Sequence, residues 1–224
     1  MASREEILGK IQAALENGRT DPALPNAPDV WPVEGLASDA LFDKFAENLK
    51  AVAGRAVFCA DKTDAAQKIA AELAKLGPTI RLGVKPGNEP LAESVQKAFT
   101  GSLTFASAPA DPDADPKSFE SMSASLVSAD FLLADTGSAA IRARTAYERL
   151  LCYLAPACMI VAKKSALREH LPHAWPELAA SLAADAPPAG ELLLMTGPSR
   201  TADIEKILIL GVHGPKTVVV FVVD

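Results

Sequence analysis

The chain has 224 residues and a formal net charge of −6, and its hydrophobic and charged fractions of 49% and 22% are ordinary for a globular protein. This length predicts one domain, or one domain with an extension, and the acidic balance argues against a nucleic-acid partner. Three cysteines are too few for an iron–sulfur cluster, which needs about four protein ligands, and too sparse for a secreted disulfide framework.

The first 37 residues are predicted to form a helix followed by an extended arm. Ser3 and Glu6 make a capping-box pattern, and apolar residues at helical spacing follow, which predicts a helix over residues 3–17. Four prolines then recur every three or four positions and favour an extended arm over a helix: Pro22, Pro25, Pro28 and Pro32. Trp31 favours an arm docked on a protein surface, and a partly disordered tail is the alternative.

No targeting signal is evident in the sequence. Glu5 and Glu6 stand where a signal peptide would be basic, and no apolar run approaches the roughly 18 residues of a membrane span. We therefore expect a cytoplasmic protein with no membrane span.

From residue 38 onward, predicted helices alternate with short apolar runs. The runs have the length of strands and cover residues 56–60, 79–84, 102–106, 131–134, 158–162, 192–195 and 218–223. Strands so uniformly apolar are typical of a parallel sheet covered by helices on both faces. The sequence thus predicts an α/β fold with a mostly parallel sheet over residues 38–224, preceded by the helix and arm of residues 1–37.

Two loops after predicted strands carry the residues most suited to ligand chemistry. In parallel α/β sheets, ligands bind beyond the carboxyl ends of the strands. The first loop has a carboxylate, a glycine and two hydroxyls, and a simple Asx or Ser/Thr turn is its alternative. Its residues are Asp135, Thr136, Gly137 and Ser138.

The second loop, residues 196–205, combines a turn with a fixed cation. Gly197 and Pro198 turn the chain, and Ser199 or Thr201 can cap a following helix that has Asp203 and Glu205 in its first turn. Arg200 beside hydroxyls and free N–H groups fits a carboxylate or a phosphate. The alternative is a helix cap in which Arg200 pairs with a neighbouring acid.

Histidines and cysteines provide few further candidates. His213 lies in a glycine- and proline-bounded turn, where it is either a general acid or base or a hydrogen-bonded structural residue. His170 and His173 have the spacing of a metal pair, but Pro172 lies between them and no third ligand is near, so no metal site is expected. Cys152 and Cys158 are interpreted as core residues rather than nucleophiles. The sequence also lacks the glycine motifs of dinucleotide, nucleoside-triphosphate and hydrolase sites.

Three motifs together resemble one family. They are ADTGS at residues 134–138, GPSRTADIE at 197–205 and GVHGP at 211–215, and they are similar to the lactate-utilisation (LUD) domain family, in particular its lactate utilisation protein C branch. The resemblance implies a fold similar to the sugar-phosphate isomerase and CoA-transferase-like α/β group. It also implies a family pocket, in which we expect Glu205, His213 and Asp135 in catalytic roles and the other residues of the two loops in substrate binding: Thr136, Gly137, Ser138, Gly197, Ser199, Arg200, Thr201 and Asp203.

The resemblance further implies a part in oxidising L-lactate to pyruvate beside iron–sulfur partner proteins. Longer relatives carry a cysteine-rich ferredoxin-like segment that is absent from this sequence, so we expect a non-redox subunit that binds a small carboxylate, with clusters only in the partners. A stand-alone isomerase or transferase acting on a sugar phosphate or a CoA thioester is the alternative. It would need a second basic cluster, for which the candidates are Lys85, Lys163, Lys164 and Lys216. A scaffold without a ligand is the third possibility.

Overall fold

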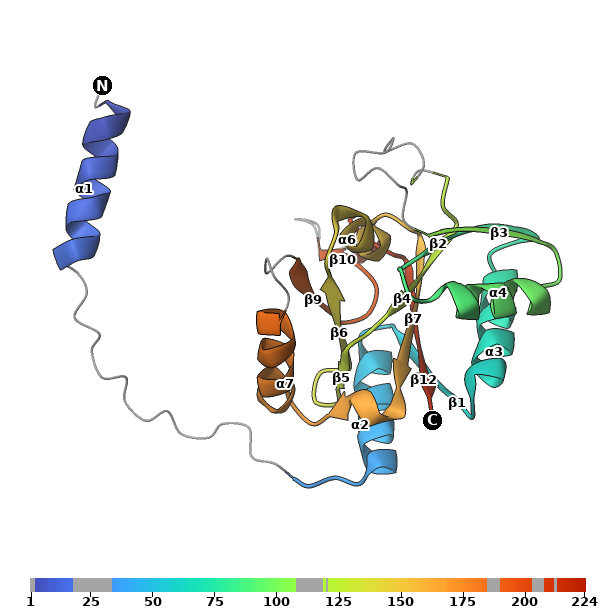
Figure 1. Ribbon diagram of the computed structural model, residues 1–224. Helices are drawn as coiled ribbons and strands as arrows, with labels where there is room; N and C mark the ends of the chain where they lie inside the picture. The colour runs from blue at the N-terminus through green and yellow to red at the C-terminus, as the bar shows by residue number, and fades with distance from the viewer. Residues whose placement is uncertain are drawn as a thin grey trace. The chain divides into compact units, whose positions relative to one another are not determined.

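The computed structural model describes residues 3–17, 34–107, 119, 121–184, 190–202, 208–211 and 213–224 (Figure 1). The chain divides into two compact units, Met1–Pro32 and Val33–Asp224. In the first unit, α1 runs over Arg4–Asn17, as predicted. Its capping box forms: Ser3 N donates to Glu6 Oε2 at 2.9 Å, and Glu6 N donates to Ser3 Oγ at 3.2 Å. The predicted arm, with its prolines and Trp31, lies outside the described residues.

The second unit is built on a six-stranded sheet in which every pairing is parallel. The strand order is β1-β12-β7-β4-β2-β3. The α/β class and the mostly parallel sheet predicted from the sequence are therefore confirmed. The strands are β1 (Arg55–Cys59), β12 (Thr217–Val223), β7 (Ala157–Lys163), β4 (Ala124–Ser128), β2 (Thr79–Val84) and β3 (Ser102–Ser107).

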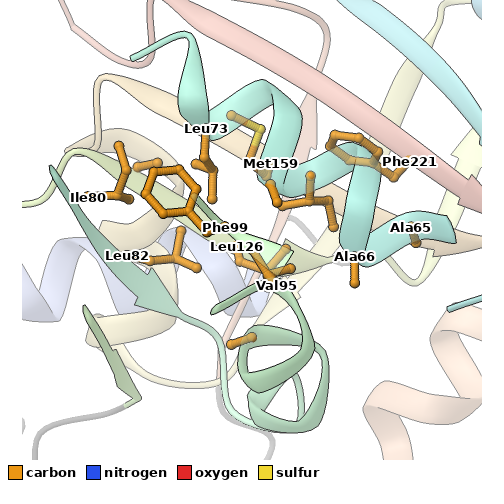
Figure 2. Packing of buried hydrophobic residues seen from close by; sticks show 14 of the residues in the cluster. Ala65, Ala66, Leu73, Ile80, Leu82, Val95, Phe99, Leu126, Met159 and Phe221 are labelled. Carbon is orange, nitrogen blue, oxygen red and sulfur yellow. The ribbon is translucent and has the colours of Figure 1, made fainter. Parts of the chain in front are cut away.

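Alternate residues of β12, β7 and β4 enter two separate hydrophobic cores, because successive side chains of a strand point to opposite faces. In β12, Val219 and Phe221 pack with α3 (Lys62–Ala74) and α4 (Glu89–Ala98) on one face (Figure 2). Val218 and Val220 pack on the other face with α2 (Ser38–Ala51) and α6 (Ala146–Tyr153). Burial on both faces explains why these strands are apolar throughout.

A second sheet packs on the α2 side and differs from the prediction. Its order is β8-β5-β6-β9, with strands β8 (Leu167–Arg168), β5 (Phe131–Leu133), β6 (Ser138–Ala143) and β9 (Glu191–Met195). β6 runs antiparallel to both β5 and β9. The apolar runs 131–134 and 192–195 therefore do not belong to the parallel sheet, and that prediction was wrong. Short apolar runs report burial and not strand direction, and here the turn at Asp135–Gly137 reverses the chain.

The helix predicted after Thr196 is also absent from the described residues of that segment. β10 (Arg200–Ala202) instead pairs antiparallel with β11 (Leu208–Leu210). Thr201 is therefore a strand residue and not a helix cap. Asp203 and Glu205, expected in the first turn of that helix, lie outside the described residues.

The described helices are short. The last, α7, spans Leu171–Ala184, and none of the helices in the described part of the chain is long and apolar enough to cross a membrane.

Candidate functional site

The structure brings the two predicted loops together. Strand β6 follows the first loop and β9 precedes the second, and the two strands pair with Ala139 opposite Met195. One step further along, Ser138 Oγ lies 2.6 Å from Thr196 Oγ1, so the hydroxyls of the two loops are hydrogen-bonded to each other. Sequence reasoning thus selected two segments that are neighbours in space, although the sheet that joins them is not the predicted one.

Asp135 contacts His170. In the sequence analysis this histidine was considered only as a metal ligand together with His173, and that site was rejected. Asp135 Oδ2 lies 3.0 Å from Nδ1 of His170, whose side chain is buried, and Thr136 Oγ1 donates to Asp135 Oδ1 at 3.3 Å. His170 and His173 contact edge to face with ring centroids 5.3 Å apart. A carboxylate that fixes one ring nitrogen orients the imidazole and leaves the other nitrogen for proton transfer. The pair joins residues 35 positions apart, which is why sequence spacing gave no sign of it.

The two loop glycines serve packing. Gly137 has φ +65°, and a Cβ there would lie 2.3 Å from the backbone nitrogen of Leu49 on α2. Gly197 has φ +74°, and its Cβ would lie 2.7 Å from the carbonyl oxygen of Val52 at the end of the same helix. Asn48 Nδ2 adds a 2.8 Å hydrogen bond to the carbonyl of Ala134. Both loops are therefore seated on the C-terminal part of α2, and their glycines permit the close approach.

The second loop interlocks with the GVHGP segment through its backbone. Ser199 N donates to the carbonyl of Pro215 at 3.0 Å, and Gly211 N donates to the carbonyl of Ser199 at 2.9 Å. Arg200 starts β10 and is exposed, and no described residue forms an ion pair with it. His213 is exposed in the turn.

A third location, which the sequence prediction did not select, has the topology expected of a ligand site. After β2 the chain passes through α4 to β3, which is the next strand toward one edge of the sheet. The chain that leaves β4 returns to the sheet at β7 and later at β12, which both lie toward the opposite edge. β2 and β4 are adjacent, so the loops after them diverge at a switch point, where open parallel sheets bind ligands. We call the cavity there the switch-point crevice. It has a volume of about 1190 Å³.

The crevice is lined by residues that follow the carboxyl ends of five strands. Gly87 and Asn88 come from the loop after β2, Ala129 and Asp130 from the loop after β4, and Asp61, Lys164 and Asp224 follow β1, β7 and β12. Helices α2, α4 and α7 and the strands β5 and β8 contribute further lining residues. Charged lining residues of both signs are present: Asp61, Lys62, Asp130, Lys163, Lys164, Arg168, Glu177 and Asp224.

Lys85, which follows β2 directly, ties the end of that strand to β4 and β6. It is 9% exposed, and its Nζ donates to the carbonyl of Arg142 at 2.8 Å and to that of Ser128 at 3.3 Å. Glu148 Oε2 lies 3.9 Å away. Of the four basic candidates named from the sequence, Lys85 is therefore structural, whereas Lys163 and Lys164 line the crevice. Lys216 packs its side chain against Gly211.

The three cysteines are buried in two different cores. Cys59 packs with α3 and α4, and Cys152 and Cys158 lie in the core on the α2 side. Burial raises the pKa of Cys59 and of Cys158 to about 11, and it also raises the pKa of Cys152. The thiols are therefore protonated near neutral pH, which fits the prediction of Cys152 and Cys158 as core residues.

The parallel sheet, covered on both faces and with a crevice at its switch point, places the second unit in the doubly covered α/β class. A profile of the LUD domain matches residues 42–223, and the chain belongs to this family. Lactate utilization protein C of Bacillus pumilus (strain SAFR-032) is 27% identical over 139 residues, which are 62% of this chain. That match spans only 57% of the relative's length.

A solved structure supports the fold. A DUF162 family protein from Deinococcus radiodurans superimposes with a TM-score of 0.58 and 16% identity, over 84% of this chain and 99% of that one. At this level of identity the comparison shows a shared fold.

Proposed function

We propose that this protein is a cytoplasmic component of an L-lactate utilisation system, in which it binds a small carboxylate while iron–sulfur partner proteins carry the electrons of the oxidation of lactate to pyruvate. Membership of the LUD domain family, together with similarity to a protein named for lactate utilisation, is the observation that carries the proposal.

The paired loops supply groups suited to a carboxylate. Arg200 is exposed beside Ser199, and the hydroxyls of Ser138, at the start of β6, and Thr196, directly after β9, join the two loops. A guanidinium binds a carboxylate through two parallel hydrogen bonds, so Arg200 is the residue we assign to the substrate's charge. The pair of Asp135 and His170 is the candidate for holding or moving a proton of the bound hydroxy acid.

The position of the cysteines supports the assignment of the iron–sulfur clusters to partner proteins. An iron–sulfur cluster is held by thiolates that converge on one point. Here Cys59 is separated from Cys152 and Cys158 by the parallel sheet, and all three thiols are buried with raised pKa values. On this proposal the clusters of the system are bound by the partner proteins.

Anaerobic co-purification of the native protein from its source tests the proposal. We expect recovery of an iron–sulfur protein, and we expect calorimetric titration of the purified chain to show binding of lactate or pyruvate. Oxidation of lactate by the purified chain alone with a dye acceptor would show that it is an enzyme in its own right. Absence of both a partner and carboxylate binding would leave only a scaffold role and overturn the proposal.

A further inference from the structure

We propose that α1 is an interaction surface for a second copy of this chain, and that two α1 helices pair antiparallel through one apolar face. The inference goes beyond the role in lactate utilisation and does not depend on it, because α1 lies outside the segment that matches the LUD domain.

The surface is an apolar stripe along α1. Ile7, Ile11 and Leu15 recur every four residues, and Leu8 precedes Ile11 by three, so all four side chains lie within about 100° of the helix circumference. These residues, which we call the α1 stripe, are 49–66% exposed. Every other described side chain of the helix is exposed as well, so the described part of the chain leaves the stripe open to a partner.

The helix itself calls for a packing partner. Isolated helices shorter than about 12–15 residues are marginal in water, and most of the stability of a helix in a protein comes from packing of its apolar face. α1 has 14 residues, and Gly9 in its interior weakens it further. A surface that covers the α1 stripe would supply the missing stability.

The spacing of the stripe fits another helix. Leu8, Ile11 and Leu15 are separated by three and then four residues, which is the a–d–a spacing of a heptad. Arg4 stands four residues before Leu8 and takes the preceding d position. A partner helix along this seam therefore meets a cation at the N-terminal end and aliphatic side chains at the following positions.

The charges select an antiparallel copy of α1 as that helix. In a parallel pair equivalent positions meet, so the two Arg4 side chains would repel each other. In an antiparallel pair Leu8 packs on Ile11, and Arg4 of one copy lies beside Leu15 and Glu16 of the other. The end that receives Arg4 carries the acid Glu16, no basic residue in its last turn and the negative end of the helix dipole. α1 is thus complementary in charge to its own reversed copy.

The composition and size of the surface set the kind of association. Three acids, Glu5, Glu6 and Glu16, outnumber the basic Arg4 and Lys10, whereas helices that lie on membranes are rich in basic residues. Four aliphatic side chains form a smaller patch than the roughly 800 Å² per partner of a stable interface. We therefore expect a weak, reversible dimer.

Sedimentation of the full chain at increasing concentration tests the inference. We expect a monomer–dimer equilibrium between about 10 µM and about 1 mM. Ile11→Glu places a charge in the seam and should weaken association at least about tenfold. Ala13→Glu is the control, because it adds the same charge on the opposite side of the helix and should leave the dimer constant within about twofold.

Two outcomes of sedimentation would overturn the inference. A chain that stays monomeric over this range would show that a different partner covers the α1 stripe. Equal association of Ile11→Glu and the wild type would place the dimer contact elsewhere on the chain. Ile11 is exposed in the single chain, so its replacement leaves the packing of the domain intact.

Cross-linking tests the direction of the helices. The native cysteines are buried, so Arg4→Cys and Leu15→Cys each introduce one accessible thiol. Mixed under mild oxidation, with a tag on one variant, the two should form the mixed disulfide faster than either variant links to itself. Faster linkage of Arg4→Cys to itself would show a parallel pair and contradict the proposed arrangement.

Discussion

The backbone of Gly137 lies so close to that of Leu49 that a Cβ on the glycine would be 2.3 Å from the leucine nitrogen. This contact seats the turn of Asp135 on α2. We predict that Gly137→Ala lowers the free energy of unfolding by about 3 kcal/mol or more, because it adds an overlap with backbone to the cost of a left-handed φ. Urea denaturation measures the loss.

Gly35 provides a matched control for that substitution. Its φ of +69° is nearly that of Gly137, but nothing lies within 4 Å of the position a Cβ would take. Gly35→Ala should therefore cost only the backbone strain, about 1 kcal/mol. Equal losses in the two variants would mean that the contact with α2 contributes nothing.

Replacing Lys85 should destabilise the domain strongly. Lys85→Met removes the donor to the carbonyls of Ser128 and Arg142 and leaves Glu148 buried without its cation. We expect a loss of about 2–4 kcal/mol in thermal or urea unfolding. The double variant with Glu148→Gln should recover part of that loss, because it removes the uncompensated charge. A loss below about 0.5 kcal/mol would show that Lys85 does not hold the end of β2 to β4 and β6.

Glu169 should make the domain sensitive to acid. Its carboxylate accepts from the backbone nitrogens of Glu34 at 2.6 Å and Leu36 at 2.8 Å. Burial opposes ionisation, but the backbone donors outweigh it, so the pKa of Glu169 is lowered from its ordinary 4.5. A lowered pKa in the folded state means that the contribution to stability is present above pH 4.5 and is lost as the pH falls below it.

The variant Glu169→Gln should therefore be less stable than the wild type at neutral pH by about 2 kcal/mol, and this difference should shrink as the pH falls below 4.5. Urea denaturation at a series of pH values measures both effects. Glu177→Gln is the control, because Glu177 is exposed and forms only a surface ion pair with Arg168. A pH-independent difference for Glu169→Gln would contradict a role of the charge.

Arg200 should determine carboxylate affinity if the proposed function is correct. Arg200→Ala should weaken binding of lactate or pyruvate by roughly 1.5–3 kcal/mol, the range for a hydrogen bond to a charged group. Titration calorimetry measures the change. Arg149→Ala removes an exposed arginine that is already paired with Glu191 and should have no effect. Normal carboxylate binding by Arg200→Ala would assign Arg200 a structural role.

Local patterns predicted most of the parallel sheet but not the second sheet. The apolar run at residues 218–223 was located well because burial on both faces leaves a continuous hydrophobic signal, whereas the run at 79–84 contains the exposed residues Thr79 and Arg81. The same signal at residues 131–134 could not reveal strand direction, and β4 and β6, with their small residues, gave no clear run. Direction is set by the turns and by pairing between distant segments.

The sequence likewise revealed only some residues of the candidate site. Asp135, Ser138 and Arg200 were selected as candidates because polar groups near glycines stand out in a sequence. Asn88 was missed, because an amide in a polar loop has no local mark, and only the crossing of the chain between β2 and β4 shows that it lines a crevice. The partner of Asp135, His170, was equally hidden by sequence distance.

The seating of both glycine loops on α2 also has a consequence for folding cooperativity. Phe45 and Leu49 of α2 belong to the core that the parallel sheet shares with the second sheet. An element anchored at both loops and in the common core cannot open without exposing both layers. The smaller sheet should therefore not behave as a separate foldon: in native-state hydrogen exchange, the amides of β6 should open with the same free energy and denaturant dependence as those of β7.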